Sequence, residues 1–233
     1  MTFLIVFACT VVAVFLMKPA IKKAPAAWYV AATVLMALYV SGLQGWLPLP
    51  VRSTLFLLLQ KGFLAVALFA VVMFIGAFPR DGRPRKHLMA IRAELSIIAC
   101  ILVCGHIVVY CLSYVPLVLE AGIINPFVAV GLAVAAAITV LLIVLGVTSF
   151  GSVKVRMSKQ AWVKVQKWAY VFFSLTYAHV LAMLLPSALG GGTAAVQSVA
   201  AYTVVFGVYA VLRVARALRE SEGAVSKVSA HRF

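Results

Sequence analysis

Long apolar runs alternate with short polar segments along nearly the whole chain. A run of about 20 apolar residues can cross the hydrocarbon core of a bilayer as an α-helix. In the third run, Gln60 and Lys61 interrupt the apolar sequence. Helices are predicted over residues 1–17, 26–46, 54–78, 91–115, 127–150, 168–185 and 193–212. The pattern therefore predicts an all-α, polytopic transmembrane helix bundle of about seven helices.

The loop charges predict how this bundle is oriented. Lysine and arginine gather after the first, third, fifth and seventh runs, and the other loops hold little beyond Arg52. Because these residues concentrate on the cytoplasmic side, we expect the N-terminus outside and the C-terminus in the cytoplasm. The first run has basic residues only after it, which favours a retained helix over a cleaved signal peptide. We expect a multi-pass protein of the cell membrane.

Composition narrows the class of protein. Hydrophobic residues make up 65% of the chain and charged residues 11%, and the mean hydropathy is +1.13, far above the values of soluble domains. The formal net charge of +15 lies in loop clusters rather than on a soluble basic face, so we expect no nucleic-acid partner. Four cysteines lie within apolar runs without a Cys-x-x-Cys spacing, and we interpret them as packing residues: Cys9, Cys100, Cys104 and Cys111.

Two predicted helices each carry a histidine inside the apolar sequence. His106 lies 11 residues after Leu95, and His179 lies 11 residues after Trp168, which is about 16 Å of helix in each case. Both helices are expected to run from inside to outside, so the histidines can lie at matching depth in the outer half of the membrane. Two neutral imidazoles at one depth suit axial ligation of a haem iron. The alternative is that each histidine hydrogen-bonds a neighbouring group within the packed bundle.

Several spaced blocks carry a resemblance to a known family. They are Arg92-Ala93-Glu94-Leu95 with His106 14 residues after the arginine, Asn125-Pro126-Phe127-Val128-Ala129-Val130-Gly131, Thr148-Ser149-Phe150, and Trp162 with Gln166-Lys167-Trp168-Ala169-Tyr170 and His179. Together they resemble the ferric-reductase-like transmembrane domain. Within that family they look most like the haem-binding membrane subunit of bacterial periplasmic methionine sulfoxide reductase systems. The resemblance implies b-type haem held by histidines on two helices, with His106 and His179 as axial ligands, and electron transfer across the membrane.

The resemblance also divides the chain into three parts. Residues 1–53 carry the first two helices, residues 54–212 form the haem-binding ferric-reductase-like core, and residues 213–233 form a basic cytoplasmic tail. The first helix looks like an addition to the usual six.

One departure from the family is informative. The sulfoxide-reductase subunits have a histidine 13 residues before the second ligand, where this chain has Gln166. The corresponding positions before His106 hold Arg92 and Ala93. We therefore expect one haem b, in the outer half of the membrane, and an inner gap that a flavin such as FMN, a quinone, or aromatic side chains must cross.

Two charged residues are candidates for contact with a cofactor. Arg92, at the cytoplasmic end of its helix, can hold a flavin phosphate or a quinone carbonyl, and anchoring to lipid headgroups is the alternative. Lys61 lies about 13 Å inside the outer boundary if Arg52 marks it. Its ammonium group is expected to pair with a haem propionate, and extension of the side chain to water is the alternative. Trp168 and Phe172 lie near the His179 face of their helix. They can shorten an electron path, and ordinary packing of aromatic rings at helical spacing is the alternative.

These observations predict an electron-transfer subunit of an oxidoreductase. Since the sequence shows no dinucleotide fingerprint or flavin domain, the donor is expected to be a cytoplasmic flavin reductase or the quinol pool. By resemblance, the acceptor is an extracytoplasmic reductase or another redox protein. The alternatives are a quinol-oxidising cytochrome b anchor and, in another class, a cofactor-free membrane transporter or assembly subunit. No convincing internal repeat of the kind many transporters carry is visible.

Overall fold

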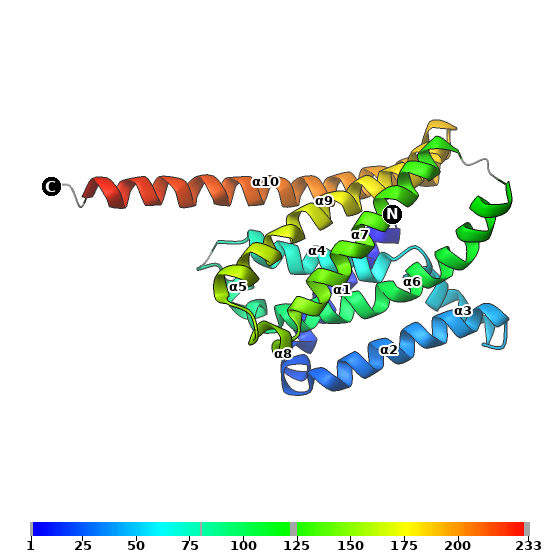
Figure 1. The fold of residues 1–233 in the computed structure, drawn as a ribbon, viewed down its shortest axis with the longest axis horizontal. Helices are drawn as coiled ribbons and strands as arrows, with labels where there is room; N and C mark the ends of the chain where they lie inside the picture. The colour runs from blue at the N-terminus through cyan, green and yellow to red at the C-terminus, as the bar shows by residue number, and fades with distance from the viewer. Residues whose placement is uncertain (1, 80, 122–124, 231–233) are drawn as a thin grey trace.

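The computed structural model describes the whole chain except residues 1, 80, 122–124 and 231–233 (Figure 1). Every regular element of the described residues is helical. The α-helices are α1 (Thr2–Lys23), α2 (Pro25–Ser41), α3 (Leu49–Leu55), α4 (Phe63–Ala77), α5 (Arg83–Leu88), α6 (Arg92–Ala121), α7 (Pro126–Ser149), α8 (Gly151–Lys154), α9 (Lys159–Leu189) and α10 (Thr193–Ala230). Short 3-10 turns cover Gly42–Gln44 and Met89–Ile91, and a π-helical turn covers Phe56–Gln60.

The described helices include six that are long and apolar enough to cross a membrane. The helices over Leu49–Gln60 and Phe63–Ala77 make a seventh span if they are taken together, with a bend of 44° between them. The break falls at the predicted interruption at Gln60 and Lys61. The prediction of a polytopic all-α bundle is confirmed, and the chain is a multi-pass membrane protein.

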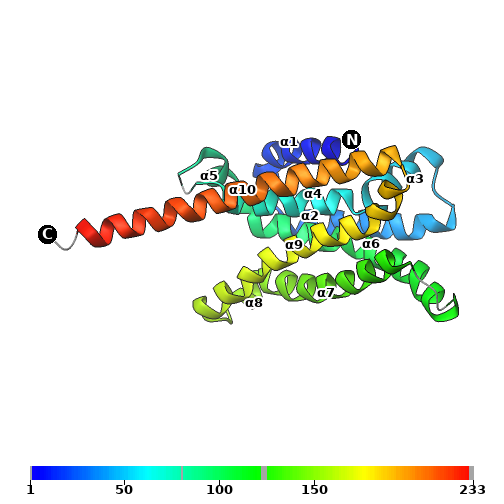
Figure 2. The same cartoon turned by 90° about the horizontal axis from the view of Figure 1, so that it is seen from above.

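Helix α4 lies at the centre of the bundle. It packs against α1, α6 and α10, and twelve of its fifteen residues are buried. A helix that is apolar all round is expected in such a position. Helices α7 and α9 pack along each other, and Figure 2 shows them on the side of the bundle opposite α1.

All the basic loops meet at one end of the molecule. Helices α5 and α8, the turn between α1 and α2, and the C-terminal part of α10 lie at this end, whereas α3 and the turn between α9 and α10 lie at the other (Figure 1). We call the first of these the basic end. The fold therefore brings the basic loops to one end, as their alternation along the sequence predicts. Which side of a membrane this end faces stays a prediction.

Helix α9 begins earlier than the apolar sequence indicates. The segment before Trp168 was expected to be a basic linker, but α9 starts at Lys159. Ser158 caps the helix, since its hydroxyl accepts a hydrogen bond of 3.2 Å from the backbone N–H of Ala161. A serine cap satisfies a free amide of the first turn, so a polar, basic sequence can extend the apolar helix.

Two predicted helix ends also move outward. Pro116 and Pro186 lie inside α6 and α9, close to the C-terminal end of each. Each proline therefore removes one bond of the helical ladder near a terminus without ending the helix. The loop expected between the predicted helices over residues 91–115 and 127–150 lies partly outside the described residues.

Helix α10 continues far beyond its predicted end near residue 212, through Ala230. Within this extension Arg216 pairs with Glu220, one turn later, at 2.8 Å. The same guanidinium donates hydrogen bonds to the carbonyls of Gly76 and Phe78 at the end of α4. Residues 213–233 were expected to form a separate tail, but the first of them continue α10 and contact the bundle.

Candidate functional site

A carbonyl from another helix holds the imidazole of His106, in the middle of α6. Nδ1 of His106 lies 2.6 Å from the backbone oxygen of Gln60. Gln60 is the last residue of the π-helical turn at which the span formed by α3 and α4 breaks. The terminal carbonyls of a helix lack an amide partner within that helix. The break in the span thus makes this oxygen available to the histidine.

Gly62 completes the break. It has φ +65° and ψ 15°, a left-handed conformation that glycine adopts without steric cost. A Cβ at this position would lie 3.7 Å from Nδ1 of His106, so the turn passes directly beside the imidazole. Lys61 precedes Gly62 in the turn, and its side chain is exposed.

His179, on α9, has the same kind of partner on α7. Its Nδ1 lies 2.9 Å from the backbone oxygen of Gly131. Gly131 is buried, and a Cβ there would come within 3.2 Å of the side chain of Met183. The missing side chain lets α9 approach α7 closely, which brings the Gly131 carbonyl within reach of the ring.

These two hydrogen bonds define the protonation of both rings. A carbonyl oxygen only accepts hydrogen bonds, so Nδ1 of each histidine must carry the proton. In the neutral imidazole Nε2 then keeps its lone pair. A metal-bound histidine usually donates its second ring nitrogen to a carbonyl or carboxylate, which fixes the orientation of the ring. His106 and His179 therefore both have the form and the support of metal ligands.

The two histidines stand on helices that are not in tight contact. In the described chain α7 packs along α9 and also contacts α6, whereas α6 and α9 are not a closely packed pair. No group of three or more potential protein ligands occurs in the described residues. Two separate imidazoles fit a group that needs two axial ligands, such as a haem, better than a metal ion held by the protein alone.

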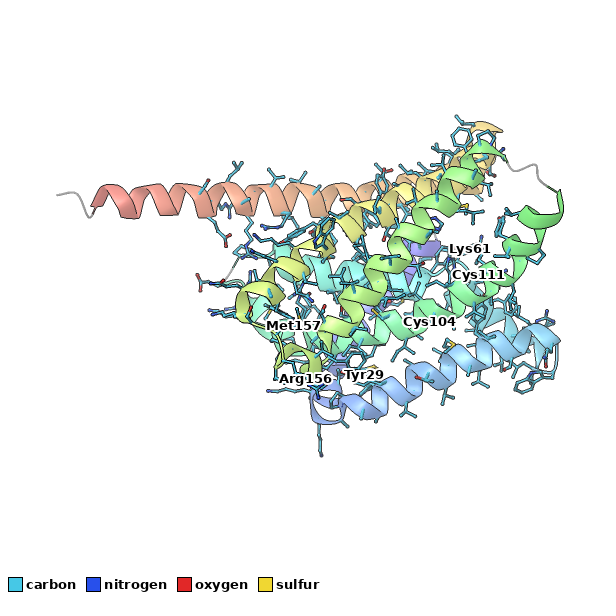
Figure 3. All side chains as sticks on the ribbon, viewed as in Figure 1. Tyr29, Lys61, Cys104, Cys111, Arg156 and Met157 are labelled. Carbon is cyan, nitrogen blue, oxygen red and sulfur yellow. The ribbon has the colours of Figure 1, made fainter. Side chains whose placement is uncertain are left out.

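Aromatic rings continue from His106 along the same face of α6. The ring of Tyr110 lies 4.6 Å from the imidazole, and that of Tyr114 lies 5.8 Å from Tyr110 and stacks on it. Figure 3 shows Lys61 and Cys111 close to the course of α6 in this view. His106 thus lies among aromatic and apolar side chains, and the turn that contains Lys61 lies beside it.

The structure separates the two charged candidates. Lys61 lies beside the partner of His106, whereas Arg92 begins α6 near the basic end, 14 residues before His106, or about 21 Å along the helix. The Nε–H of Arg92 donates a hydrogen bond of 3.2 Å to the carbonyl of Val72 on α4. Arg92 therefore belongs to a different part of the molecule from the histidine pair.

The two aromatic residues predicted near the electron path also separate. Phe172 is buried, and its ring meets that of Phe69 edge-on at 5.0 Å. Trp168 is 54% exposed, so it faces the surroundings of the bundle. The helical spacing placed both near the His179 face, but only Phe172 contributes to the interior.

A cavity of about 170 Å³ occupies the bundle between the histidines and the basic end. Its walls come from α4, α6, α7 and α9, with Phe69 and Phe172 on the apolar side. Arg92 and Gln166 both line it, although 74 residues separate them in the sequence. The fold thus brings to one cavity two of the positions that the resemblance compares with histidines of the sulfoxide-reductase subunits.

Hydrogen bonds fix the polar wall of this cavity. The indole N–H of Trp162 donates to the carbonyl of Thr148 at 3.0 Å, and the amide of Gln166 donates to the hydroxyl of Thr148 at 3.1 Å. Lys154 lies over the Trp162 ring, with its Nζ 4.6 Å from the ring centroid. The sequence blocks that contain these residues were recognised, but nothing in their spacing showed that they surround a cavity.

Comparison with known proteins agrees with the helices and motifs described above. The model of the family described as ferric reductase like transmembrane component matches residues 61–177, which is about half of the chain and includes His106 but ends just before His179. The chain belongs to this family of membrane proteins.

One curated relative, described as an uncharacterized protein of Treponema pallidum (strain Nichols), is 38% identical over 173 residues. The match covers 74% of this chain and 48% of the relative, so the chain spans about half the length of the curated relative it matches. No solved structure matches the chain.

Proposed function

We propose that this protein holds one b-type haem between His106 and His179 and carries electrons across the membrane. The observation that supports this most directly is the shared state of the two imidazoles. Each Nδ1–H is bound by a backbone carbonyl, at 2.6 Å for His106 and 2.9 Å for His179, which leaves each Nε2 free as a ligand. Membership of the ferric-reductase-like family supports a redox role in the membrane.

The chain's own residues would bind, orient and enclose this group. A bound haem would supply a one-electron ferric/ferrous couple. The carbonyls of Gln60 and Gly131 would keep both imidazoles neutral and fixed in rotation. The ammonium group of Lys61, beside the His106 partner, would pair with a haem propionate, because a cation at this depth needs an anion or water.

We further propose that the basic end faces the cytoplasm, with the N-terminus outside, and that the membrane is the cell membrane. The loops of this end carry most of the lysine and arginine, in keeping with the positive-inside rule. Electrons would then enter from a cytoplasmic flavin reductase or the quinol pool and leave to an extracytoplasmic reductase or redox protein. The methionine sulfoxide reductase membrane subunits remain the nearest functional parallel that the sequence motifs suggest.

A visible spectrum of the purified full chain, expressed with excess haem, tests the central proposal. We expect a reduced b-type band and one haem per polypeptide by the pyridine haemochrome method. His106→Ala and His179→Ala should each abolish the band. His87→Ala is the matched control, because His87 is exposed near the basic end and contacts Lys18 and Phe15. A colourless wild-type protein, or a full band in both ligand variants, would refute the haem and favour a cofactor-free transporter or assembly subunit.

A further inference from the structure

Two polar side chains of α10 lie one turn apart on the same face of the helix, toward the basic end. Tyr209 is buried, and its ring packs edge-on against those of Phe74 on α4 and Phe173 on α9, with centroids 5.7 and 4.9 Å apart. Arg213 follows four residues later, and a helical side chain reaches back over the turn before its own Cα. The guanidinium of Arg213 and the hydroxyl of Tyr209 therefore lie along one seam between α9 and α10.

Each of these side chains carries a buried donor that has no acceptor. Nη1 of Arg213 and the hydroxyl of Tyr209 are both shielded, and neither has a hydrogen-bond partner among the described residues. The Nε–H of Arg213 donates to the hydroxyl of Tyr170 on α9, at 3.1 Å. The ion pairs of the described residues involve Lys86 and Arg216 and leave Arg213 without a carboxylate. Because a buried donor without an acceptor is costly, and a charged one more so, we expect an acceptor from outside the chain.

The seam lies at the level of a membrane surface. Arg213 directly follows the last apolar run, and one turn further on Arg216 holds the carbonyls at the end of α4. On α9, Trp168 is 54% exposed and Tyr170 is 41% exposed. Exposed tryptophan and tyrosine at the end of a membrane span are typical of the headgroup region. The acceptor for Arg213 is therefore expected among the lipid headgroups.

Tyr170 covers the outer side of the guanidinium. Cζ of Arg213 lies 5.0 Å from the centroid of the Tyr170 ring. A ring that is so exposed can turn aside without disturbing the packed interior, and the arginine side chain has several rotatable bonds. A headgroup can therefore reach the seam from the lipid side, between α9 and α10.

A phosphate group matches the donors of the seam. Its oxygens accept hydrogen bonds, and the amino groups of a guanidinium bind them in pairs. Its negative charge also offsets that of Arg213, which a water molecule or an ester carbonyl does not do. Basic pockets between membrane-spanning helices bind anionic lipid headgroups in this way.

We propose that the seam between α9 and α10 binds the phosphodiester of one anionic phospholipid, held by Arg213 and Tyr209. The amino groups of Arg213 donate to the phosphate oxygens, and the hydroxyl of Tyr209 donates to one of them from the next turn. The headgroup then joins α10 to α9, the helix that carries His179. The site requires no haem, so it stands independently of the proposed function.

Native mass spectrometry of the delipidated full chain tests this site. We expect one phosphatidylglycerol to bind about fivefold more tightly than phosphatidylcholine with the same acyl chains, since the choline cation opposes Arg213. Arg213→Leu should remove this preference. Tyr209→Phe should weaken the binding of phosphatidylglycerol about threefold or more, because it removes a hydrogen bond and keeps the ring. Arg219→Leu is the matched control, since it removes the same charge from an exposed position of the same helix.

Several outcomes would overturn the lipid site. They are equal affinity of the wild type for the two lipids, an unchanged preference in Arg213→Leu, and an equal loss of preference in Arg219→Leu. Thermal unfolding in detergent distinguishes lipid from free phosphate: phosphatidylglycerol should raise the Tm of the wild type, and an equal rise with inorganic phosphate would overturn the lipid assignment. Should Arg213→Leu fail to fold, wild-type affinity in Tyr209→Phe would refute the site, because that variant retains its packing on Phe74 and Phe173.

Discussion

Gly62 offers a sharp test of how the broken span positions His106. The residue has φ +65°, and an alanine in this left-handed region costs about 1–2 kcal/mol. The added Cβ would lie 3.7 Å from Nδ1 of His106, an ordinary contact distance. Gly62→Ala therefore perturbs the backbone of the turn and does not create a clash with the imidazole.

The strain can be relieved if the turn rotates toward helical dihedral angles. The Gln60 carbonyl would then rejoin the helical ladder, and Nδ1 of His106 would lose its 2.6 Å partner. A bias of about 1–2 kcal/mol changes a two-state population by about 5–30-fold. We therefore expect Gly62→Ala to release haem about 5–30 times faster than the wild type. Transfer of haem to excess apomyoglobin, followed by its visible spectrum, measures this rate.

Gly76→Ala is the matched control. Gly76 lies near the C-terminal end of the same helix, α4, and a Cβ there would meet nothing within 4 Å. Alanine favours the helical state over glycine, so this variant should release haem at the wild-type rate. Equal rates for Gly62→Ala and Gly76→Ala would show that the break does not position the ligand.

Three further substitutions test other contacts. Arg216→Leu removes charged hydrogen bonds to two carbonyls at the end of α4 and should lower the free energy of unfolding by about 1.5–3 kcal/mol. We expect a lower Tm in detergent for this variant and an unchanged Tm for Arg219→Leu, whose side chain is exposed. Equal Tm values for the two variants would contradict the contact. Lys61→Met should speed haem release and lower the midpoint potential, and Lys61→Arg should preserve both; an unchanged potential in Lys61→Met counts against the propionate pair. Tyr110→Leu removes the ring 4.6 Å from the His106 imidazole and should shift the ferric EPR g values, whereas Tyr110→Phe should not; wild-type g values in the leucine variant would show that the ring does not orient the ligand.

The number of spans and the sorting of charge were predictable because both arise from local properties of the sequence. In a bilayer each spanning segment must satisfy its own backbone hydrogen bonds, so one apolar run corresponds to one span, even where the third run is broken into two helices. The interruption at Gln60 and Lys61 was visible for the same reason. Helix ends were less predictable, as Pro186 inside α9 and the cap at Ser158 illustrate, since ends depend on capping and packing more than on hydropathy.

The candidate ligands could also be predicted from the sequence. An ionisable side chain within the membrane costs so much free energy that its presence in an apolar run indicates a function. Their supporting partners could not. The carbonyls of Gln60 and Gly131 are backbone atoms, present at every residue, and only the bend of the α3–α4 span and the close approach of α9 to α7 bring them to His106 and His179. The cavity is likewise a property of four helices together, and no single segment encodes it.

The class of fold, the alternating charge of the loops and the pair of histidines follow from the amino-acid sequence alone. The packing of the helices is what leaves Nε2 of both imidazoles free, sets Lys61 beside His106 and brings Arg92 and Gln166 to a separate cavity. The physical reason is that hydropathy acts within one segment, whereas hydrogen-bond geometry and enclosed space depend on how segments far apart in the chain pack together.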